Sequence, residues 1–245
     1  MKKERNSMKL YMDLHTHTMA CGHGYSTLKE NIGAAKEAGL QILGLSEHGP
    51  AVPGGPNKIF FSNYRCIPRQ YGDLRLLCGA EANIMDLEGS LDLGEDILSR
   101  MDYVIASMHV VCVRAGNRQE NTRACIKAMQ NPRVKILGHP DDARYPLDYE
   151  ALVKAAGEEG VFLEVNNASL HPESARKGGR ENVKTLLLTC KKYRVPIILG
   201  SDSHICYTVG KFEEALGLIA ETDFPQELIL NCHPEQIDRV LAVNM

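Results

Sequence analysis

Histidines are the residues of this sequence best placed to do chemistry, because seven of the nine lie at or just past the ends of short apolar segments. These seven are His15, His17, His23, His48, His109, His139 and His204. Uncharged imidazoles that pack together without a cation would be left with unmatched lone pairs. Imidazole and carboxylate ligands, without thiolate, suit zinc, manganese or iron. The pattern therefore predicts a metal site.

Two carboxylates accompany the histidines. Glu81 ends an apolar segment and supplies a carboxylate that can bridge two cations. His15 and His17 are spaced i, i+2, so on a strand both imidazoles point the same way. Asp202 and His204 repeat this spacing near the end of the last long apolar segment.

The segments that must position these side chains alternate between strand and helix patterns. Strands are predicted over residues 9–15, 40–48, 74–82, 103–109, 134–140, 160–167 and 195–204. Their continuous Val, Ile and Leu content is typical of parallel strands that are buried on both faces. A helix is predicted between Thr27, which has capping-box spacing to Glu30, and Gly39. Further helices are predicted over 120–130, 148–159 and 181–193, and a last strand and helix over 226–231 and 234–243.

This alternation predicts an α/β fold, as either a barrel or an open sheet. No GxGxxG or GxxxxGK[ST] loop follows a predicted strand, which removes the main nucleotide-binding form of an open sheet. In a βα barrel the carboxyl ends of the strands form the face that carries the active site, and the histidines gather at those ends. We predict one domain over residues 9–245 after a short N-terminal extension, residues 1–8, with a long loop at 49–70 and a hairpin at 84–93.

Composition and charge exclude several classes of protein. The 245 residues are 44% hydrophobic and 24% charged, which is ordinary for a globular chain and excludes disorder. The net charge of −3 provides no basic footprint for nucleic acid or membrane surfaces. No segment approaches the ~18 apolar residues of a spanning helix. The eight cysteines lack CxxC spacing and the N-terminus lacks a secretory signal, so we expect a cytoplasmic protein with reduced thiols.

Short motifs that run in order over nearly the whole chain resemble one known family. They are DLHTHT (13–18), HGYST (23–27), LSEHGP (45–50), GAEANI (79–84), SMH (107–109), LGHP (137–140), EVNNAS (164–169), RKG (176–178) and GSDSH (200–204). With these motifs the chain resembles the PHP (polymerase and histidinol phosphatase) domain family, and closely its stand-alone YcdX-like phosphatases. The resemblance implies a distorted (β/α)7 barrel of parallel strands. It also implies a trinuclear site of divalent metal ions at their carboxyl ends, usually zinc and in relatives manganese or iron.

The resemblance further implies which residues hold each ion. One ion would take His15, His17, Glu81 and Asp202. A second would share Glu81 as the bridge and add His109 and His139, and the third would be held by His23, His48 and His204. The chain departs from the family outside this set: Val110 follows His109 where close relatives can carry an acidic residue, and Asp141 and Asp142 follow His139-Pro140. These departures bear on substrate preference.

Three divalent ions facing two carboxylates leave roughly four positive charges for hydroxide and substrate to balance, which favours an anionic substrate such as a phosphate. We therefore predict hydrolysis of a small phosphate monoester by attack of a metal-bound hydroxide. The predicted catalytic residues are Glu81, His109 and Asp202, and either Asp202 or a second bound water would protonate the leaving group. Asn166, Arg176 and Lys177 are predicted substrate contacts, with a solvated charged loop as the alternative for the two cations.

Three other functions stay open. An amidohydrolase barrel also begins with HxH, but it typically uses a carboxylated lysine on a middle strand, where this chain has Glu81. A metal-dependent phosphodiesterase or nuclease acting on single-stranded DNA would use the same cluster, although the net charge favours a small phosphorylated substrate over nucleic acid. The third is a non-enzymatic metal-binding module. The sequence predicts no membrane partner and is compatible with a homo-oligomer.

Overall fold

Strands and helices alternate along the chain in the computed structural model, which describes residues 8–241. The strands are β1 (Met12–Asp13), β2 (Ile42–Leu45), β3 (Gln70–Tyr71), β4 (Leu74–Cys78), β5 (Ala80–Asn83), β6 (Val104–Ser107), β7 (Val134–Leu137), β8 (Phe162–Asn166) and β9 (Ile197–Gly200). The α-helices are α1 (Leu28–Glu37), α2 (Lys58–Ser62), α3 (Glu95–Leu98), α4 (Arg118–Met129), α5 (Tyr149–Glu159), α6 (Asn167–Leu170), α7 (Gly179–Tyr193) and α8 (Glu213–Glu221). The 3-10 helices are η1 (Met19–Cys21), η2 (Asn63–Cys66), η3 (Cys206–Thr208), η4 (Gln226–Leu228), η5 (Leu230–Cys232) and η6 (Pro234–Arg239).

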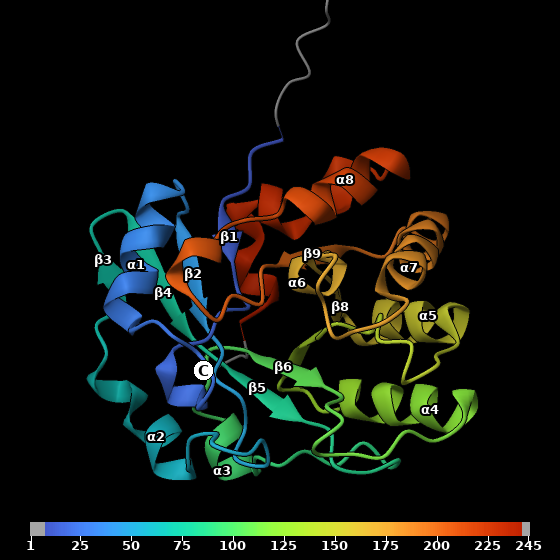
Figure 1. The fold of residues 1–245 in the computed structure, drawn as a ribbon, viewed down its shortest axis with the longest axis horizontal. Coiled ribbons are helices and arrows are strands. Elements are labelled where there is room, and N and C mark those ends of the chain that lie inside the picture. The colour runs from blue at the N-terminus through green and yellow to red at the C-terminus, as the bar shows by residue number, and fades with distance from the viewer. Residues whose placement is uncertain (1–7, 242–245) are drawn as a thin grey trace, which may run out of the picture.

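The strands form two sheets, ordered β1-β2-β4-β3 and β5-β6-β7-β8-β9 (Figure 1). Neighbouring strands are parallel, as predicted, except that β3 pairs antiparallel with β4. Isolated parallel bridges lie between the two sheets, one joining Thr16 to Ser203 and one joining His48 to Glu81. These bridges bring the segments that follow β1, β2 and β9 next to one another and to β5.

The strand predicted over 74–82 is broken at Gly79 into β4 and β5. The first part pairs with β2 and the second with β6, so the chain changes sheet at this residue. A Cβ atom at position 79 would lie 2.6 Å from the ring of Tyr103 and 2.8 Å from its carbonyl oxygen. Only glycine lets the backbone approach this closely.

Two hydrophobic clusters cover the two faces of the strands. The first holds residues such as Leu43 and Val104, together with apolar residues of the helices. The second holds their neighbours Ile42 and Ile105, with Leu230, Ile237 and Val240 from the C-terminal segment among its other members. Successive residues of a strand point to opposite faces. Apart from β3, which is partly exposed, the strands are therefore buried on both faces, which confirms the interpretation of their continuous apolar sequences.

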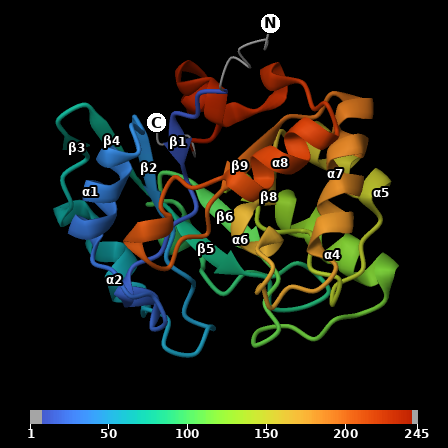
Figure 2. The same ribbon diagram turned by 45° about the horizontal axis from the view of Figure 1, so that its top comes forward.

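The helices cover the outer face of the strands. Helices α4, α5 and α7 lie side by side, with α4 in contact with β6 and β7 and α5 in contact with β8 (Figure 1, Figure 2). Helix α1 begins with the predicted capping box, in which the Thr27 N–H donates to Glu30 Oε2 at 2.7 Å. None of the helices in the described residues is both long and apolar enough to cross a lipid bilayer.

The C-terminal segment differs from its prediction. Residues 226–231 form η4 and η5 in place of a strand, with one isolated bridge between Ile229 and Ile197. The helix predicted over 234–243 is the 3-10 helix η6, Pro234–Arg239. Residues 242 and 243 of that prediction lie outside the described residues, as do residues 1–7 of the N-terminal extension. Leu230, Ile237 and Val240 of this segment lie in the second hydrophobic cluster, and Ile229 and Cys232 lie in the first, so these residues pack in the core and do not extend a sheet.

Two other segments also differ. The predicted loop at 49–70 contains α2 and η2, where Phe61 and Tyr64 are buried in the first hydrophobic cluster. The hairpin predicted at 84–93 is limited to a single antiparallel bridge between Ile84 and Leu91.

Candidate metal centre and active site

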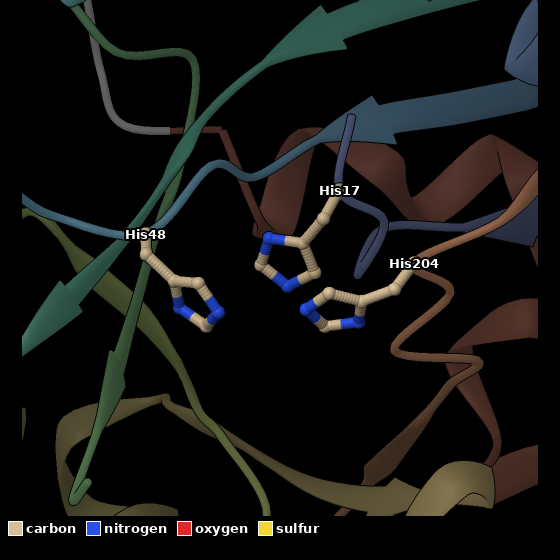
Figure 3. A group of neighbouring side chains, drawn as sticks. All are labelled: His17, His48 and His204. Carbon is tan, nitrogen blue, oxygen red and sulfur yellow. The ribbon is translucent and has the colours of Figure 1, made fainter. Parts of the chain in front are cut away.

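All nine predicted metal ligands come together at the carboxyl ends of the strands. His15 and His17 follow β1, His48 follows β2, Glu81 lies in β5, His109 follows β6, His139 follows β7, and Asp202 and His204 follow β9. His23 reaches the cluster from the segment after η1, where its ring stacks on those of His48 and His204. Figure 3 shows His17, His48 and His204 turned toward one another from three separate segments.

Glu81 lies at the centre of the cluster and is fully buried. Its Oε1 atom lies 2.9 Å from His139 Nε2 and 3.4 Å from both His15 Nε2 and His109 Nε2. Its Oε2 atom lies 2.5 Å from His48 Nδ1 and 3.5 Å from His17 Nε2. One carboxylate thus faces imidazoles from several strands, as a bridging ligand must.

Asp202 forms a second anionic centre. Its Oδ1 atom lies 3.3 Å from His17 Nε2 and 3.5 Å from His15 Nε2. Its Oδ2 atom accepts hydrogen bonds from Arg176 Nη1 at 2.9 Å and Asn166 Nδ2 at 3.1 Å. One oxygen is therefore held by neighbouring side chains, while the other faces the imidazoles.

The remaining imidazoles stack at the outer end of the cluster. The His17 ring lies 4.3 Å, between centroids, from the rings of His48 and His204. His204 Nε2 lies 3.0 Å from His23 Nε2. The structure thus brings His23, His48 and His204 together, with His17 between this group and the two carboxylates.

Although they lie close to one another, several buried polar atoms of the cluster make no hydrogen bond of suitable geometry within the described residues. They include His15 Nε2, both ring nitrogens of His17, His48 Nδ1, His109 Nε2, Glu81 Oε2 and Asp202 Oδ1. An unsatisfied buried polar group costs about 1–3 kcal/mol, and here such groups converge on one volume. Divalent cations would satisfy them, and the nitrogen and oxygen donors match those that zinc, manganese and iron accept. The residues therefore fit a metal centre.

An outer layer of polar side chains orients the imidazoles. Glu164 Oε1 lies 2.6 Å from His15 Nδ1, and Asn83 Oδ1 lies 2.7 Å from His109 Nδ1. In both rings Nδ1 contacts a side chain of this outer layer, so Nε2 faces the centre of the cluster and is free to bind a metal ion. Neither Glu164 nor Asn83 was among the predicted site residues. An acidic residue within the apolar strand FLEVN was the signal that could have found Glu164.

The electrostatics keep Glu81 charged and His17 neutral, whereas Glu164, Glu81 and Asp202 outweigh burial and hold the pKa of His15 well above its usual range. Burial opposes ionisation of Glu81, but His15, His48 and His109 hold its pKa well below the usual range. Burial, with the neighbouring His48 and His204, lowers the pKa of His17 well below the usual range. Ionised carboxylates and neutral imidazoles are the protonation states in which these side chains bind metal ions.

Backbone strain is present at two of the predicted ligands. His139 has φ of 28° and Asp202 has φ of 53°, in the left-handed region that residues other than glycine rarely adopt. The His139 N–H is held by Glu164 Oε2 at 2.7 Å. Such strain costs about 1–3 kcal/mol and concentrates at functional sites. The surrounding contacts thus hold these two ligands in position.

A cavity of about 480 Å3 opens beside the cluster. Val52, Pro53, Val110 and Val111 form an apolar part of its lining, and Asp142 with Arg144 forms a charged part. His23, His48, His109, Asp202 and His204 also line the cavity. The cavity size lies within the ~300–1,000 Å3 range of small-molecule sites.

The predicted substrate contacts differ in their positions. Arg176 lines the cavity, and its Nη1 atom donates to Asp202, to Ser169 Oγ at 3.0 Å and to Asn166 Oδ1 at 3.2 Å. Asn166 is fully buried beside Glu164 and Asp202. Lys177 is exposed and is not among the described residues that line this cavity.

Comparisons with known proteins agree with this geometry. The sequence profile of the PHP domain matches residues 13–168. A probable phosphatase of Clostridium acetobutylicum is 45% identical over 94% of this chain and 93% of its own length. A probable phosphatase of Clostridium botulinum is 44% identical over the same shares, 94% and 93%. The crystal structure of histidinol phosphate phosphatase from Lactococcus lactis, complexed with zinc, L-histidinol and phosphate, has a TM-score of 0.58 at 17% identity over 88% of this chain and 94% of that chain. The structural likeness shows that the two proteins share a fold.

Proposed function

The chain belongs to the PHP domain family, and from this premise we propose that it is a metal-dependent phosphatase that hydrolyses a small phosphate monoester at a trinuclear metal site. The observation that carries the proposal is the position of Glu81, whose two oxygens face imidazoles from separate segments. A second support is the set of unpartnered ligand atoms around it. The names of the relatives, probable phosphatases, support the reaction class.

The proposal assigns the ligands to three ions, with zinc preferred over manganese or iron. His15, His17, Glu81 and Asp202 would hold the first ion, and Glu81, His109 and His139 the second. His23, His48 and His204 would hold the third. The set His15–His17–Asp202, whose ligand atoms lie within 4.8 Å of one another, supports the first ion. The set His48–Glu81–His109 joins residues assigned to the second and third ions, so it places these two positions next to each other.

In the proposed reaction, bound divalent ions would supply an activated water as the nucleophile and would offset charge on the phosphate. The residues of the chain position the reactants. Glu81 and His109 hold the centre of the site, and Arg176, which lines the cavity, would donate to a phosphate oxygen. Asn166 keeps Asp202 in place, and we expect a smaller contribution from the exposed Lys177.

Asp202 is better suited to hold an ion than to protonate the leaving group. Burial opposes its ionisation, but His15 and Arg176 keep its pKa well below the usual range. A carboxylate that is ionised at neutral pH has no proton to donate. We therefore propose that a water molecule in the cavity supplies this proton.

The proposal includes a closed seven-stranded barrel as the single domain 9–245. The bridges Thr16–Ser203 and His48–Glu81 support closure, because they link the edges of the two sheets. Counting β4 and β5 as one strand, as their sequence continuity suggests, and leaving out the antiparallel strand β3, the other six strands are β1, β2, β6, β7, β8 and β9. The second hydrophobic cluster then fills the inside of the barrel. Eight free thiols support a cytoplasmic location.

Metal analysis of the purified protein, followed by a panel of phosphate monoesters and diesters, tests this function. We expect three ions per chain, and faster turnover of monoesters than of diesters or single-stranded DNA. His109→Ala should lose most activity, while His171→Ala, which changes an exposed histidine, should retain it. Fewer than two ions per chain, or full activity in His109→Ala, would contradict the trinuclear mechanism. Preferred turnover of single-stranded DNA would favour a nuclease, and no turnover of any ester would favour a metal-binding module.

A further inference from the structure

A cysteine lies beside the histidines assigned to the third ion. The Sγ atom of Cys21 and one ring nitrogen each of His23 and His204 all lie within 4.8 Å of one another. Cys21 is fully buried, whereas His23 is exposed at the mouth of the cavity. We propose that Cys21 is a thiolate ligand of the third ion, which turns its histidine site into a mixed nitrogen and sulfur site.

The two histidines independently indicate a cation at this position. His23 Nδ1 lies 3.2 Å from the Cys21 carbonyl oxygen, and His204 Nδ1 lies 3.0 Å from the Asp202 carbonyl oxygen. A carbonyl oxygen can only accept, so in a neutral ring Nδ1 carries the proton and Nε2 presents a lone pair. The two Nε2 atoms nevertheless lie 3.0 Å apart. Two lone pairs at this distance repel each other unless a cation lies between or beside them.

Buried atoms on the inner side of Cys21 also lack partners. Cys21 Sγ, a ring nitrogen of His17 and a carboxylate oxygen of Glu47 form another group within 4.8 Å. His17 and Glu47 are fully buried, and within the described residues Glu47 Oε2 and both His17 nitrogens make no hydrogen bond. The sulfur therefore lies beside buried nitrogen and oxygen atoms that could also act as ligands.

The local backbone positions the Cys21 sulfur. Burial raises the pKa of the Cys21 thiol, and the N–H groups of His23 and Gly24, which donate toward the sulfur, offset only part of this effect. Gly24 approaches closely, since a Cβ atom there would lie 3.3 Å from Sγ. The turn that places the sulfur is held by Thr18, whose Oγ1 accepts from the Ala20 N–H at 3.2 Å, and by Gly22 in the left-handed conformation. On coordination the thiol would release its proton to solvent.

A thiolate changes which metal the third position prefers. Soft sulfur ligands select zinc over manganese, magnesium or calcium, whereas a site of imidazoles alone discriminates less. The inference rests on the proposed function only in requiring that a third ion binds. The experiments that test it therefore measure the metal–sulfur bond and not the rate of turnover.

Cobalt(II) substitution provides the first measurement. We expect the fully loaded wild-type protein to show a sulfur-to-cobalt charge-transfer band in the near ultraviolet. Cys21→Ser should lose this band. It should also lower the affinity for the third cobalt ion by about 10–100-fold or more, as mutations around metal sites commonly do. Cys190→Ser is the matched control, because Cys190 is a buried thiol in α7, outside the candidate ligand groups of the described residues, and it should keep the band.

Zinc X-ray absorption of the wild-type protein provides the second measurement and needs no variant. We expect a sulfur scatterer at about 2.3 Å from zinc.

The outcomes separate the inference from the proposed function. If the protein binds three ions and hydrolyses monoesters but shows neither sulfur scattering nor the cobalt band, only the thiolate ligand is overturned. A band of unchanged strength in folded Cys21→Ser also overturns it. Failure to bind a third ion overturns both the inference and the trinuclear site, whereas sulfur coordination without phosphatase activity leaves the inference standing and overturns the proposed function.

Discussion

Glu164 Oε1 lies 2.6 Å from His15 Nδ1, although the two residues are 149 positions apart in the chain. The other oxygen of Glu164 accepts from the backbone N–H of His139. One buried carboxylate therefore orients two of the proposed metal ligands. Outer carboxylates of this kind fix the tautomer and direction of a metal-binding imidazole.

Replacing this carboxylate should weaken metal binding. Glu164→Gln is expected to lower zinc affinity by about 10–100-fold, because the amide no longer holds the His15 ring with a charged acceptor. Competition with a chelator of known affinity measures the change. Glu158→Gln, on the exposed side of α5, is the matched control and should bind zinc as the wild type does. Equal affinities in the two variants would show that Glu164 has no orienting role.

Replacing Arg176 should impair turnover far more than replacing the neighbouring basic residue, Lys177. Arg176→Ala is expected to lower kcat/KM for a phosphate monoester by about 100-fold, the usual loss for a positioned donor to a developing negative charge. Lys177→Ala should change it by about twofold or less, since an exposed charge contributes little. Metal content is measured in both variants, because Arg176 also contacts Asp202. A larger effect from Lys177→Ala would reverse the assignment.

Gly200 should tolerate no side chain. A Cβ atom at this position would lie 1.8 Å from Glu164 Oε1 and 3.0 Å from His15 Cβ. Gly200→Ala is therefore expected to lower the free energy of unfolding by about 1–3 kcal/mol or more, as overpacking does, and to reduce bound metal. Denaturant unfolding and metal analysis measure both effects.

Gly33→Ala is the control for that experiment. Gly33 lies inside α1. Apart from its two chain neighbours and the backbone of that helix, no heavy atom of residues 8–241 lies within 4 Å of the point that a Cβ atom would occupy. Alanine there should raise the free energy of unfolding by about 0.5–1 kcal/mol, because it restricts the unfolded chain and favours the helix. If Gly33→Ala also lowers the free energy of unfolding, the loss in Gly200→Ala could not be assigned to the contact with Glu164 and His15.

The thiols should differ sharply in reactivity. Burial raises the pKa of Cys125 and of Cys190 to about 12, and the reactive thiolate forms only as pH rises toward that value. Cys66 is exposed. At about pH 8 we expect Ellman's reagent to react first with Cys66, and Cys66→Ser to lose that fast reaction while denaturant restores the slow ones. Rapid labelling of Cys125 or Cys190 in the native protein would contradict their burial.

The regular parts of the fold followed from local patterns. The Thr27–Glu30 capping box and the apolar runs at β2, β6, β7 and β8 predicted the alternation of helices and parallel strands. Local rules did not predict the break at Gly79, because it depends on the distant ring of Tyr103. Nor did they predict that Leu230 and Ile237 would fill a core in place of pairing as a strand and helix.

The sequence alone determined which residues gather at the site, because histidines and carboxylates at the ends of parallel strands must share one edge. Tertiary structure decided how they meet. It placed Glu81 between imidazoles of several strands, set Glu164 behind His15, and brought the sulfur of Cys21 beside His23 and His204. These relationships join segments far apart in the chain, and their distances depend on strand register, close packing at glycine and strained backbone at His139 and Asp202. A linear pattern shows residue types and spacing, but the ligand geometry arises only when the strands pack.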